Sequence, residues 1–393
     1  MSTDKRTITV RAPVNIAVIK YWGKRDEKLI IPLNDSISGT LDMEQLCATT
    51  SVAISPSFKC NQMWLNGEEV DMTANERLFR CIQEVKTMVG TSQWPADHHL
   101  QIASRNNFPT AAGLASSAAG YACLMYALCR LFGVDDAERI STLARLGSGS
   151  ACRSVYGGFV QWVAGTDHQS SIARQILDEE AWPSMRVLVL VVSDHRKDTS
   201  SSSGMKSSVE TSDLMKKRVQ DIVPQRITQM LTAIKERNFH DFAEITMRDS
   251  NQFHAICQDT YPPIHYMNDV SWSVVSLVHY FNKLYGCNKV AYTFDAGPNA
   301  CLYVLENVVP ELLALITAIY GKSESKLEVQ GIEYKKHPEL NDSLQKYAVV
   351  NACPGALKYV ISTKLGTGPQ VLSTSFDANC LIEESGGIKN NDV

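Results

Sequence analysis

The chain has 393 residues, of which 44% are hydrophobic and 20% are charged, a composition that can bury a substantial core. This length predicts two domains or one large bipartite domain, since single cores rarely grow beyond about 250–300 residues. The 38 Lys and Arg residues nearly balance the 42 Asp and Glu residues and form no basic run, which argues against a nucleic-acid-binding protein.

The sequence carries no sign of export or of membrane insertion. Its 11 cysteines are scattered and include no C-x-x-C pair, so they do not indicate a disulfide framework. No apolar stretch reaches the ~18 residues of a transmembrane helix. The N-terminus lacks the apolar segment of a signal peptide. We therefore expect a cytoplasmic protein without a membrane partner.

The first half of the chain predicts several strands and one long helix. The strand-like runs are 7–12, 48–54, 100–103 and 159–163. Residues 115–131 are rich in Ala, Leu, Met and Tyr and contain no proline, and Gly133 suits a helix C-cap. We expect a mostly buried helix that begins in a loop of small residues.

The second half mixes strands and helices without a regular βαβ period, so the predicted fold class is α+β. Strands are predicted at 186–192 and 358–363, with a strand-turn unit at 290–305. Helices are predicted at 214–236, with a break or kink at Pro224, and at 241–254 and 271–285. Residues 198–205, DTSSSSGM, are typical of a loop, and we expect the tail after Glu384 to fray.

The strongest local signal is residues 106–120, NNFPTAAGLASSAAG. Small side chains let the backbone approach a ligand closely, and the N–H groups at the start of the following helix favour phosphate. Ser116 and Ser117 add hydroxyls that can reach phosphate or a phosphate-bound Mg²⁺. The same composition also suits a helix that simply packs closely through Ala and Gly. The segment does not match a Walker A loop.

This segment resembles the phosphate loop of the GHMP kinase superfamily. Three further stretches narrow the resemblance: PVNIAVIKYWGKR at 13–25, GSGSACRS at 147–154 and AYTFDAGPNA at 291–300. Together the four resemble the mevalonate diphosphate decarboxylase family, and the similarity runs from Val10 to about Gln370.

The resemblance implies both the fold and the reaction. It implies a GHMP-kinase-like fold of two α+β lobes with the active site in the cleft between them. We place the N-terminal lobe at 1–184, with the phosphate loop, and the C-terminal lobe at 185–393, with Asp295. The implied substrates are ATP with Mg²⁺ and (R)-5-diphosphomevalonate. The implied products are isopentenyl diphosphate, ADP, phosphate and CO₂, within isoprenoid and sterol biosynthesis. A homodimer is also implied.

Such a reaction has physical requirements that the motifs can meet. A β-hydroxy acid loses CO₂ slowly because hydroxide is a poor leaving group, whereas a phosphorylated hydroxyl leaves readily. The protein must orient the hydroxyl, hold the carboxylate with a cation and bind two phosphate groups. Asp295, at a predicted strand end, suits the hydroxyl, either as a base or as an orienting group. An Asx turn before Gly297 explains the same residue without a catalytic role.

Arg153 suits the substrate carboxylate or phosphate, because its planar fork binds either group bidentately. Asn15 can bond to the substrate carboxylate or to Arg153. Lys20 supplies a compact charge, although a snorkelling lysine at the end of an amphipathic strand is an alternative explanation. With Asp295, these three are the predicted catalytic residues.

The remaining site residues follow from the resemblance. The predicted substrate-binding residues, besides Arg153, are Tyr21, Trp22, Gly23, Lys24, Arg77, Ser148, Gly149, Ser150, Ala151, Cys152 and Ser202. The predicted nucleotide-binding residues are Asn106, Pro109, Ala112, Gly113, Leu114, Ala115, Ser116 and Ser117, with Ser117 also at Mg²⁺.

Several alternatives stay open at this level. Arg77 also suits a charge on a helix surface. The loop at 199–204, with Ser202, suits either a lid over the site or an ordinary linker. The nine histidines show no metal-binding spacing. A GHMP kinase that stops after phosphoryl transfer would need the same loop and the same Asp but not the paired 13–25 and 147–154 motifs. A catalytically inactive nucleotide sensor would not need Asp295, Lys20 and Arg153 together.

Overall fold

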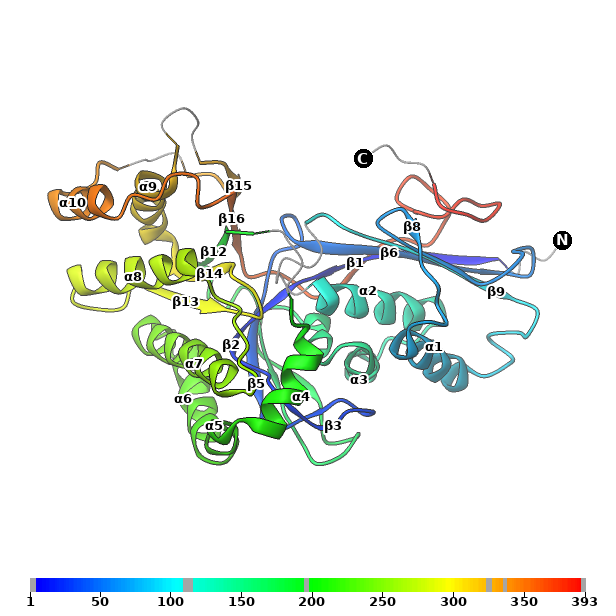
Figure 1. Cartoon of the computed structure of the whole chain (residues 1–393). Coiled ribbons are helices and arrows are strands. Elements are labelled where there is room, and N and C mark those ends of the chain that lie inside the picture. Colours follow the sequence, from blue (N-terminus) through cyan, green and yellow to red (C-terminus); the bar gives the residue numbers. More distant parts are fainter. Residues whose placement is uncertain (1–4, 109–115, 194–197, 323–326, 335–337, 390–393) are drawn as a thin grey trace.

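The computed structural model describes residues 5–108, 116–193, 198–322, 327–334 and 338–389. Three main sheets and the helices packed on them form two halves (Figure 1). This arrangement confirms the α+β class predicted from the sequence.

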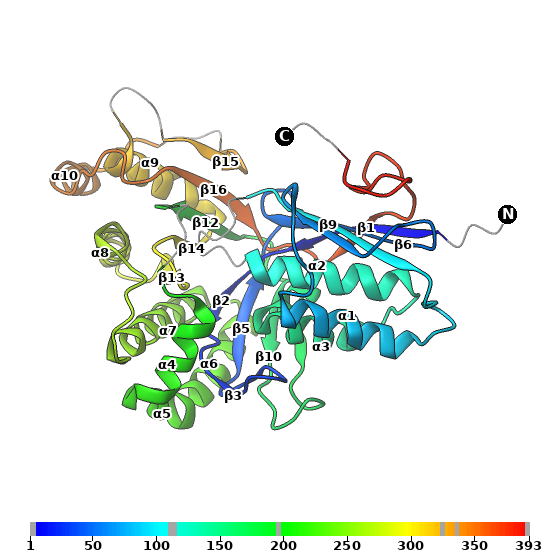
Figure 2. The same ribbon diagram turned by 45° about the vertical axis from the view of Figure 1, so that its right-hand side comes forward.

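A six-stranded sheet in the order β17-β1-β6-β9-β7-β8 forms one side of the N-terminal half. Its strands are β1 (Arg6–Pro13), β6 (Cys47–Ser55), β7 (Gln62–Leu65), β8 (Glu68–Glu69), β9 (His99–Asn106) and β17 (Gln370–Ser373). The strands predicted at 7–12, 48–54 and 100–103 lie within β1, β6 and β9. Helices α1 (Glu76–Val89), α2 (Ser116–Leu131) and α3 (Ala137–Gly147) cover one face of this sheet (Figure 2).

The helices on this sheet form for different reasons. Helix α1 starts at the N-cap Asn75 and buries Leu78, Ile82 and Val85 along one face, the spacing of an amphipathic helix. Helix α2 is buried over most of its surface, as predicted. Its small side chains let it approach the sheet so closely that the Cys123 thiol donates to backbone carbonyls of β1 and β6.

The N-terminal half contains a second sheet, which has four strands in the order β11-β10-β5-β2. Its strands are β2 (Asn15–Ile19), β5 (Ser36–Thr40), β10 (Phe159–Trp162) and β11 (Ala173–Leu177), and a short hairpin of β3 (Lys24–Asp26) and β4 (Ile31–Pro32) lies beside it. Strands β2 and β5 are buried along their whole length. The side chains of these two strands therefore face protein or the interior of a site.

The C-terminal half is built on a five-stranded sheet in the order β13-β14-β12-β16-β15. Its strands are β12 (Met185–Val191), β13 (Val290–Phe294), β14 (Ala300–Leu305), β15 (Val329–Gly331) and β16 (Tyr359–Lys364). The helices are α4 (Ser201–Thr211), α5 (Asp213–Lys217), α6 (Val223–Lys235), α7 (Phe239–Asp259), α8 (Asp269–Leu284), α9 (Val309–Tyr320) and α10 (Asp342–Val350). The strands and helices predicted in this half are confirmed, apart from the differences described next.

One prediction in the C-terminal half is wrong. Most of the segment predicted as a loop at 198–205 belongs to α4, because the Ser200 hydroxyl caps the helix start and burial of Met205 holds the first turns. The break or kink predicted at Pro224 is confirmed, because the predicted helix is divided into α5 and α6 immediately before this proline. Pro224 lies in the first turn of α6, where its missing N–H costs little, and a π-helical turn (Arg218–Ile222) joins α6 to α5.

The C-terminal segment returns to the N-terminal half. Strand β17 pairs with β1, and the buried side chains of Cys380, Leu381 and Ile382 pack on this sheet. Because Lys389 N donates to Leu381 O, the tail is held through Lys389, and the predicted fraying after Glu384 is wrong there. The boundary predicted at 184/185 did not anticipate this return.

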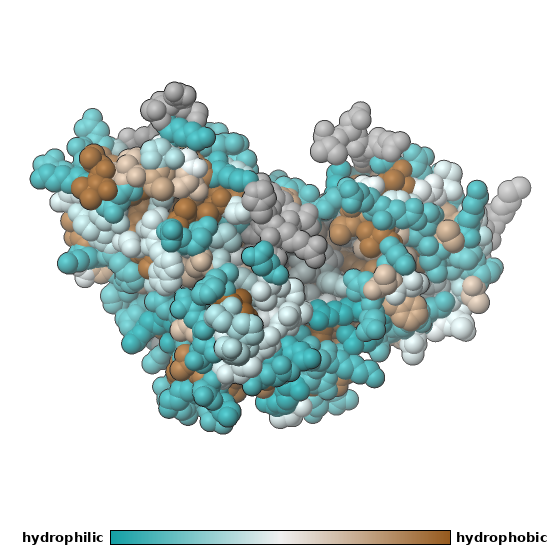
Figure 3. Space-filling view, in the orientation of Figure 1, coloured by the Kyte–Doolittle hydropathy of each residue, from teal (hydrophilic) through white to brown (hydrophobic). Residues whose placement is uncertain are grey.

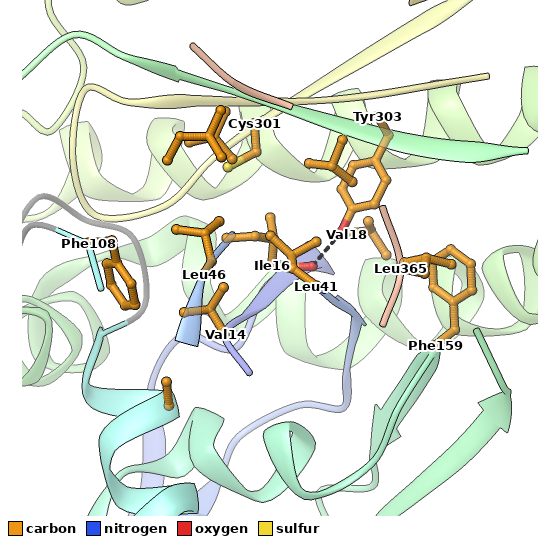
Figure 4. Packing of buried hydrophobic residues seen from close by; sticks show 14 of the residues in the cluster. Val14, Ile16, Val18, Leu41, Leu46, Phe108, Phe159, Cys301, Tyr303 and Leu365 are labelled. Carbon is orange, nitrogen blue, oxygen red and sulfur yellow. Dashed lines mark hydrogen bonds between the residues drawn. The ribbon is translucent and has the colours of Figure 1, made fainter. Parts of the chain in front are cut away.

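The two halves share one hydrophobic core. The Tyr303 hydroxyl of β14 donates to the Ile16 carbonyl of β2 at 2.9 Å, among apolar side chains from both halves (Figure 4). Gly39 of β5 makes room for it, since a Cβ there would lie 2.8 Å from the Tyr303 hydroxyl. The face of the molecule drawn in Figure 3 is mainly hydrophilic on both halves, with a hollow between them.

We predict that Ile382→Ala lowers the free energy of unfolding by about 2–5 kcal/mol, because it leaves a cavity in a fully buried site. Urea denaturation measures this loss. The control is Val350→Ala at an 82% exposed position, which should change stability by less than about 0.5 kcal/mol. Equal stability of the two variants would contradict the docking of the tail.

Candidate active site

A cavity of about 370 Å³ lies between the two halves, and both contribute residues to its wall. Most of the predicted site residues line it. They are Asn15, Lys20, Tyr21, Trp22, Lys24, Arg77, Ser116, Ser117, Ser148, Gly149, Ser150, Arg153, Ser202 and Asp295. Segments far apart in sequence therefore meet in one place.

The other predicted residues lie elsewhere. Gly23, Ala151 and Cys152 do not line the cavity, and the Cys152 thiol donates to the Gly149 carbonyl, so it supports the loop from behind. Asn106 ends β9 and its N–H donates to the Asn66 side chain. Pro109, Ala112, Gly113, Leu114 and Ala115 lie outside the described residues.

The central contact joins Lys20 to Asp295. Lys20 directly follows β2 and Asp295 directly follows β13, so each side chain is fixed by the end of a buried strand. The distance from Lys20 Nζ to Asp295 Oδ1 is 2.5 Å. The lysine side chain is 3% exposed and the carboxylate 29%, so Lys20 holds the carboxylate from the protein side while Asp295 faces the cavity.

Arg153 also lines the cavity and is held by three side-chain hydrogen bonds. It lies in the 3₁₀ segment Gly149–Val155 and is 2% exposed. Its Nε donates to Asn15 Oδ1 at 3.2 Å and to Ser38 Oγ at 2.8 Å, and its Nη1 donates to Ser36 Oγ at 2.6 Å. Burial lowers the pKa of this guanidinium. All three acceptors are neutral, so its charge is left for an anion in the cavity.

Asn15 therefore acts through Arg153. Its Nδ2 donates to the Ser150 carbonyl at 3.0 Å and to Ser154 Oγ at 2.8 Å, while its Oδ1 accepts from Arg153. Of the two partners predicted for Asn15, this geometry favours Arg153. The sequence reasoning missed Ser36 and Ser38. Their signal was small polar residues at alternate positions of a buried strand, which place both hydroxyls on one face.

Three further groups supply hydrogen-bond donors near the cavity. Among the described residues the buried Tyr21 hydroxyl has no hydrogen-bond partner, and burial raises its pKa, so it is a neutral donor. Lys24 Nζ lies 2.5 Å from Glu27 Oε2. Arg77 Nη2 donates to Ser202 Oγ at 3.2 Å, a bond that crosses from α1 to α4.

Trp22 has a packing role as well. It lies in an apolar cluster with Met205, Phe253 and Tyr266, and its indole N–H donates to Ser208 Oγ at 2.9 Å. This cluster fastens α4 against the segment that carries Lys20. Met205, Phe253, Ser200, Ser201 and Tyr121 also line the cavity and were missed, since their sequence contexts look like ordinary core or linker residues.

The described lining of the cavity has more cations than carboxylates, although the chain carries a net charge of −4. Its lining includes Lys20, Lys24, Arg77 and Arg153, and Asp295 is the only carboxylate among the described lining residues. The N-terminus of the 16-residue helix α2 adds a partial positive charge beside Ser116 and Ser117. This arrangement suits an anion that carries several charges.

The described residues offer no protein metal cluster. Within them, no three His, Cys, Asp or Glu side chains are grouped to hold a metal ion. The Ser117 and Ser148 hydroxyls lie 3.4 Å apart on the cavity wall. A divalent cation there would therefore take most of its ligands from bound phosphates. None of the helices in the described ranges is long and apolar enough to cross a membrane.

The same arrangement recurs in known proteins. Residues 12–173 match the diphosphomevalonate decarboxylase-like N-terminal domain, and residues 187–372 match the mevalonate 5-diphosphate decarboxylase C-terminal domain. The chain belongs to the diphosphomevalonate decarboxylase family. The family member from Homo sapiens is 48% identical over 95% of this chain and 96% of its own length. The one from Saccharomyces cerevisiae is 44% identical over 94% and 96%.

Solved structures of the diphosphomevalonate decarboxylase family share this fold. The Trypanosoma brucei enzyme has a TM-score of 0.84 at 37% identity, covering 93% of this chain and 98% of that one. A structure described as MDDEF in complex with MVAPP, AMPPCP and magnesium has a TM-score of 0.75 at 28% identity, covering 94% and 100%. The two-lobed GHMP-kinase-like architecture is confirmed.

His254 gives this site a measurable pH signature. It is 5% exposed on α7, and burial together with the nearby Lys20 ammonium lowers its pKa to about 3. The unfolded chain then binds more protons than the folded chain between pH 6.5 and about 3, so stability falls as the pH falls through this window.

Below pH 6.5, His254 should lower the free energy of unfolding by about 1.36 kcal/mol per pH unit. We predict that in His254→Gln the fall in this free energy between pH 7.5 and pH 4.5 is smaller by about 2–3 kcal/mol. Urea denaturation at both pH values measures this difference. His265→Gln, at an exposed position, is the control and should leave the loss unchanged. An unchanged loss in His254→Gln would show that His254 is charged in the folded protein.

Proposed function

We propose that the chain catalyses the ATP-dependent decarboxylation of (R)-5-diphosphomevalonate. The products are isopentenyl diphosphate, ADP, phosphate and CO₂, within the mevalonate pathway to isoprenoids and sterols. One observation carries this proposal: Asp295, the one carboxylate among the described lining residues, is paired with Lys20 and faces a cavity that also has the buried Arg153 on its wall. Family membership supports the identity of the substrate.

The chemistry follows from these positions. Asp295 accepts the hydrogen bond of the tertiary hydroxyl, whose oxygen attacks the γ-phosphorus of ATP while the β–γ bridging oxygen leaves with ADP. The hydroxyl proton passes to the Asp295 carboxylate if it acts as the base, or to solvent if Asp295 only orients the hydroxyl. The new phosphate then departs with the electrons of its C–O bond. The electrons of the bond to the carboxylate form the C=C bond, and CO₂ leaves. Lys20 keeps Asp295 in place and offsets its charge.

The remaining cations divide between the two ends of the substrate. Arg153, which forms no direct ion pair with a described residue, holds the carboxylate in the orientation from which it leaves as CO₂. Tyr21, Lys24 and Arg77, together with Ser148 and Ser150, suit the diphosphate. The diphosphate does not react, so these contacts contribute binding and alignment.

The nucleotide lies at the start of α2 in this proposal. Ser116 and Ser117 line the cavity there, beside the residues of the predicted phosphate loop. Mg²⁺ fits this location, because the Ser117 hydroxyl faces the cavity and the phosphates supply the other oxygens. When bound, the ion neutralises charge on the transferring phosphoryl group.

The finer assignments are proposals of the same kind. We propose lobes at 1–184 and 185–393, a division supported by the start of the C-terminal sheet at Met185. The return of β17 to the first sheet qualifies it. We also propose a cytoplasmic homodimer without a nucleic-acid partner, which the balanced charge and the family resemblance support.

The direct test measures ADP and CO₂ together. The enzyme is incubated with ATP, Mg²⁺ and diphosphomevalonate, and separately with the monophosphate and with mevalonate. We expect one CO₂ per ADP with the diphosphate and much less turnover with the others. ADP without CO₂ would identify a kinase, and no turnover with any acid would identify a nucleotide sensor.

Arg77→Ala should raise the KM for diphosphomevalonate while kcat changes less, because its proposed contact is with the non-reacting diphosphate. Steady-state kinetics at saturating ATP measure both. Arg248→Ala, an exposed arginine on α7, is the control. A large fall in kcat with an unchanged KM would contradict this role and show that Arg77 acts in the chemical step.

Asp295→Asn should leave ATP and diphosphomevalonate binding intact and reduce ADP and CO₂ formation together, by roughly 10²–10⁴-fold or more. The amide keeps the shape of the side chain but not its charge. Rapid-quench assays measure both products and calorimetry measures binding. Asp269→Asn, exposed at the start of α8, is the control. Near-normal turnover would remove Asp295 from the mechanism.

A further inference from the structure

Side chains form hydrogen bonds with both backbone groups of Lys20, its N–H and its carbonyl. Its N–H donates to Asp249 Oδ2 at 2.8 Å. Its carbonyl accepts from Arg218 Nη2 at 3.0 Å and from Asn34 Nδ2 at 3.1 Å. Lys20 lies one residue beyond β2, whose pairing with β5 ends at Ile19. The sheet therefore does not satisfy these groups, and side chains from elsewhere do.

Two of these side chains form a fully buried ion pair in the C-terminal half. Arg218 Nη1 and Nη2 donate to Asp249 Oδ1 and Oδ2 at 2.9 Å and 3.0 Å, and both side chains are 0% exposed. Burial opposes the ionisation of Asp249, but the two neighbouring arginines outweigh it and lower its pKa. The pair is thus charged and bidentate, a geometry with little freedom.

A buried ion pair of this kind contributes little net stability compared with apolar packing, so its value lies in fixing geometry. The local backbone supports this interpretation. Arg218 opens the π-helical turn Arg218–Ile222, and it is the buried residue of that turn. Such turns widen a helix locally and occur often at functional sites. Here the turn directs Arg218 at the Lys20 carbonyl.

We propose that Arg218 and Asp249 are positioning residues for Lys20. They fix its peptide groups from the C-terminal half, so that the ammonium reaches Asp295, which belongs to the same half. Both partners of the Lys20–Asp295 pair are then held by the C-terminal half: Lys20 through Arg218 of the π-helical turn and Asp249 of α7, and Asp295 through β13, which packs on α7. The expected effect on kcat rests on the proposed function. The expected effect on the Lys20–Asp295 distance does not depend on it.

The chain supplies a matched control in Arg226. Its Nη1 donates to Asp249 Oδ1 at 2.9 Å and to Gln252 Oε1 at 2.8 Å, the acceptors that Arg218 Nη1 also uses. Among the described residues, however, Arg226 makes no hydrogen bond to Lys20. Replacing either arginine by Gln leaves Asp249 paired with the other, so neither variant leaves the buried carboxylate without a cation.

The experiment measures kcat and KM of the Arg218→Gln and Arg226→Gln variants. Arg218→Gln is also combined with Lys20→Met. We expect Arg218→Gln to lower kcat by about 10- to 100-fold, since small misplacements cost this much, with the KM for ATP unchanged. Arg226→Gln should stay within about twofold. In Lys20→Met, adding Arg218→Gln should cost less than about twofold, because the group that it positions is gone.

Crystal structures of the wild-type protein, Arg218→Gln and Arg226→Gln provide a readout that is independent of activity. The distance from Lys20 Nζ to Asp295 Oδ1, 2.5 Å here, should lengthen beyond hydrogen-bond range in Arg218→Gln and persist in Arg226→Gln. If Arg218→Gln does not fold, Arg218→Lys replaces it, because Lys keeps the charge but not the planar fork.

Equal losses in the two variants, or an unchanged Lys20–Asp295 distance in Arg218→Gln, would overturn the inference. So would a full loss on adding Arg218→Gln to Lys20→Met. A wild-type enzyme that releases no CO₂ from diphosphomevalonate would instead refute the proposed function, and the distances would still decide the role of Arg218.

Discussion

The ion pair between Lys20 and Asp295 is the contact on which the site depends, because it joins the two halves of the chain inside a cavity with few other anions. A lysine that is almost fully buried needs a partner for its charge, and Asp295 supplies it. The carboxylate in turn is held in one orientation toward the cavity. The shared core and the Tyr303–Ile16 hydrogen bond hold the two halves in the relative position that the Lys20–Asp295 contact requires.

The surrounding charge is arranged to be completed by a ligand. Arg153 is buried against Asn15, Ser36 and Ser38, none of which carries a negative charge. Such an arrangement is costly in the empty protein and favourable once an anion enters. The buried Tyr21 hydroxyl fits the same view. These donors are therefore already positioned by the protein before an anion binds.

Motifs with a strong local signal were predictable from the sequence, and long-range contacts were not. Alternating strands and the Ala-rich helix α2 follow from local periodicity. The start of α4 was mistaken for a loop because serine suits both a loop and a helix cap, and burial of Met205 decides between them. The gathering of Lys20, Arg153 and Asp295 came only from the family resemblance. The roles of Ser36 and Asp249 depend on neighbours 117 and 229 residues away.

The central claim is that Asp295, held by Lys20, promotes phosphorylation of the tertiary hydroxyl before the carboxylate leaves. A single-turnover rapid-quench experiment with γ-labelled ATP and carboxyl-labelled diphosphomevalonate measures the order of the two events. The account predicts that ADP appears no later than CO₂ and that both reach one equivalent per active site. Release of CO₂ ahead of ADP, or in the absence of ATP, would contradict it.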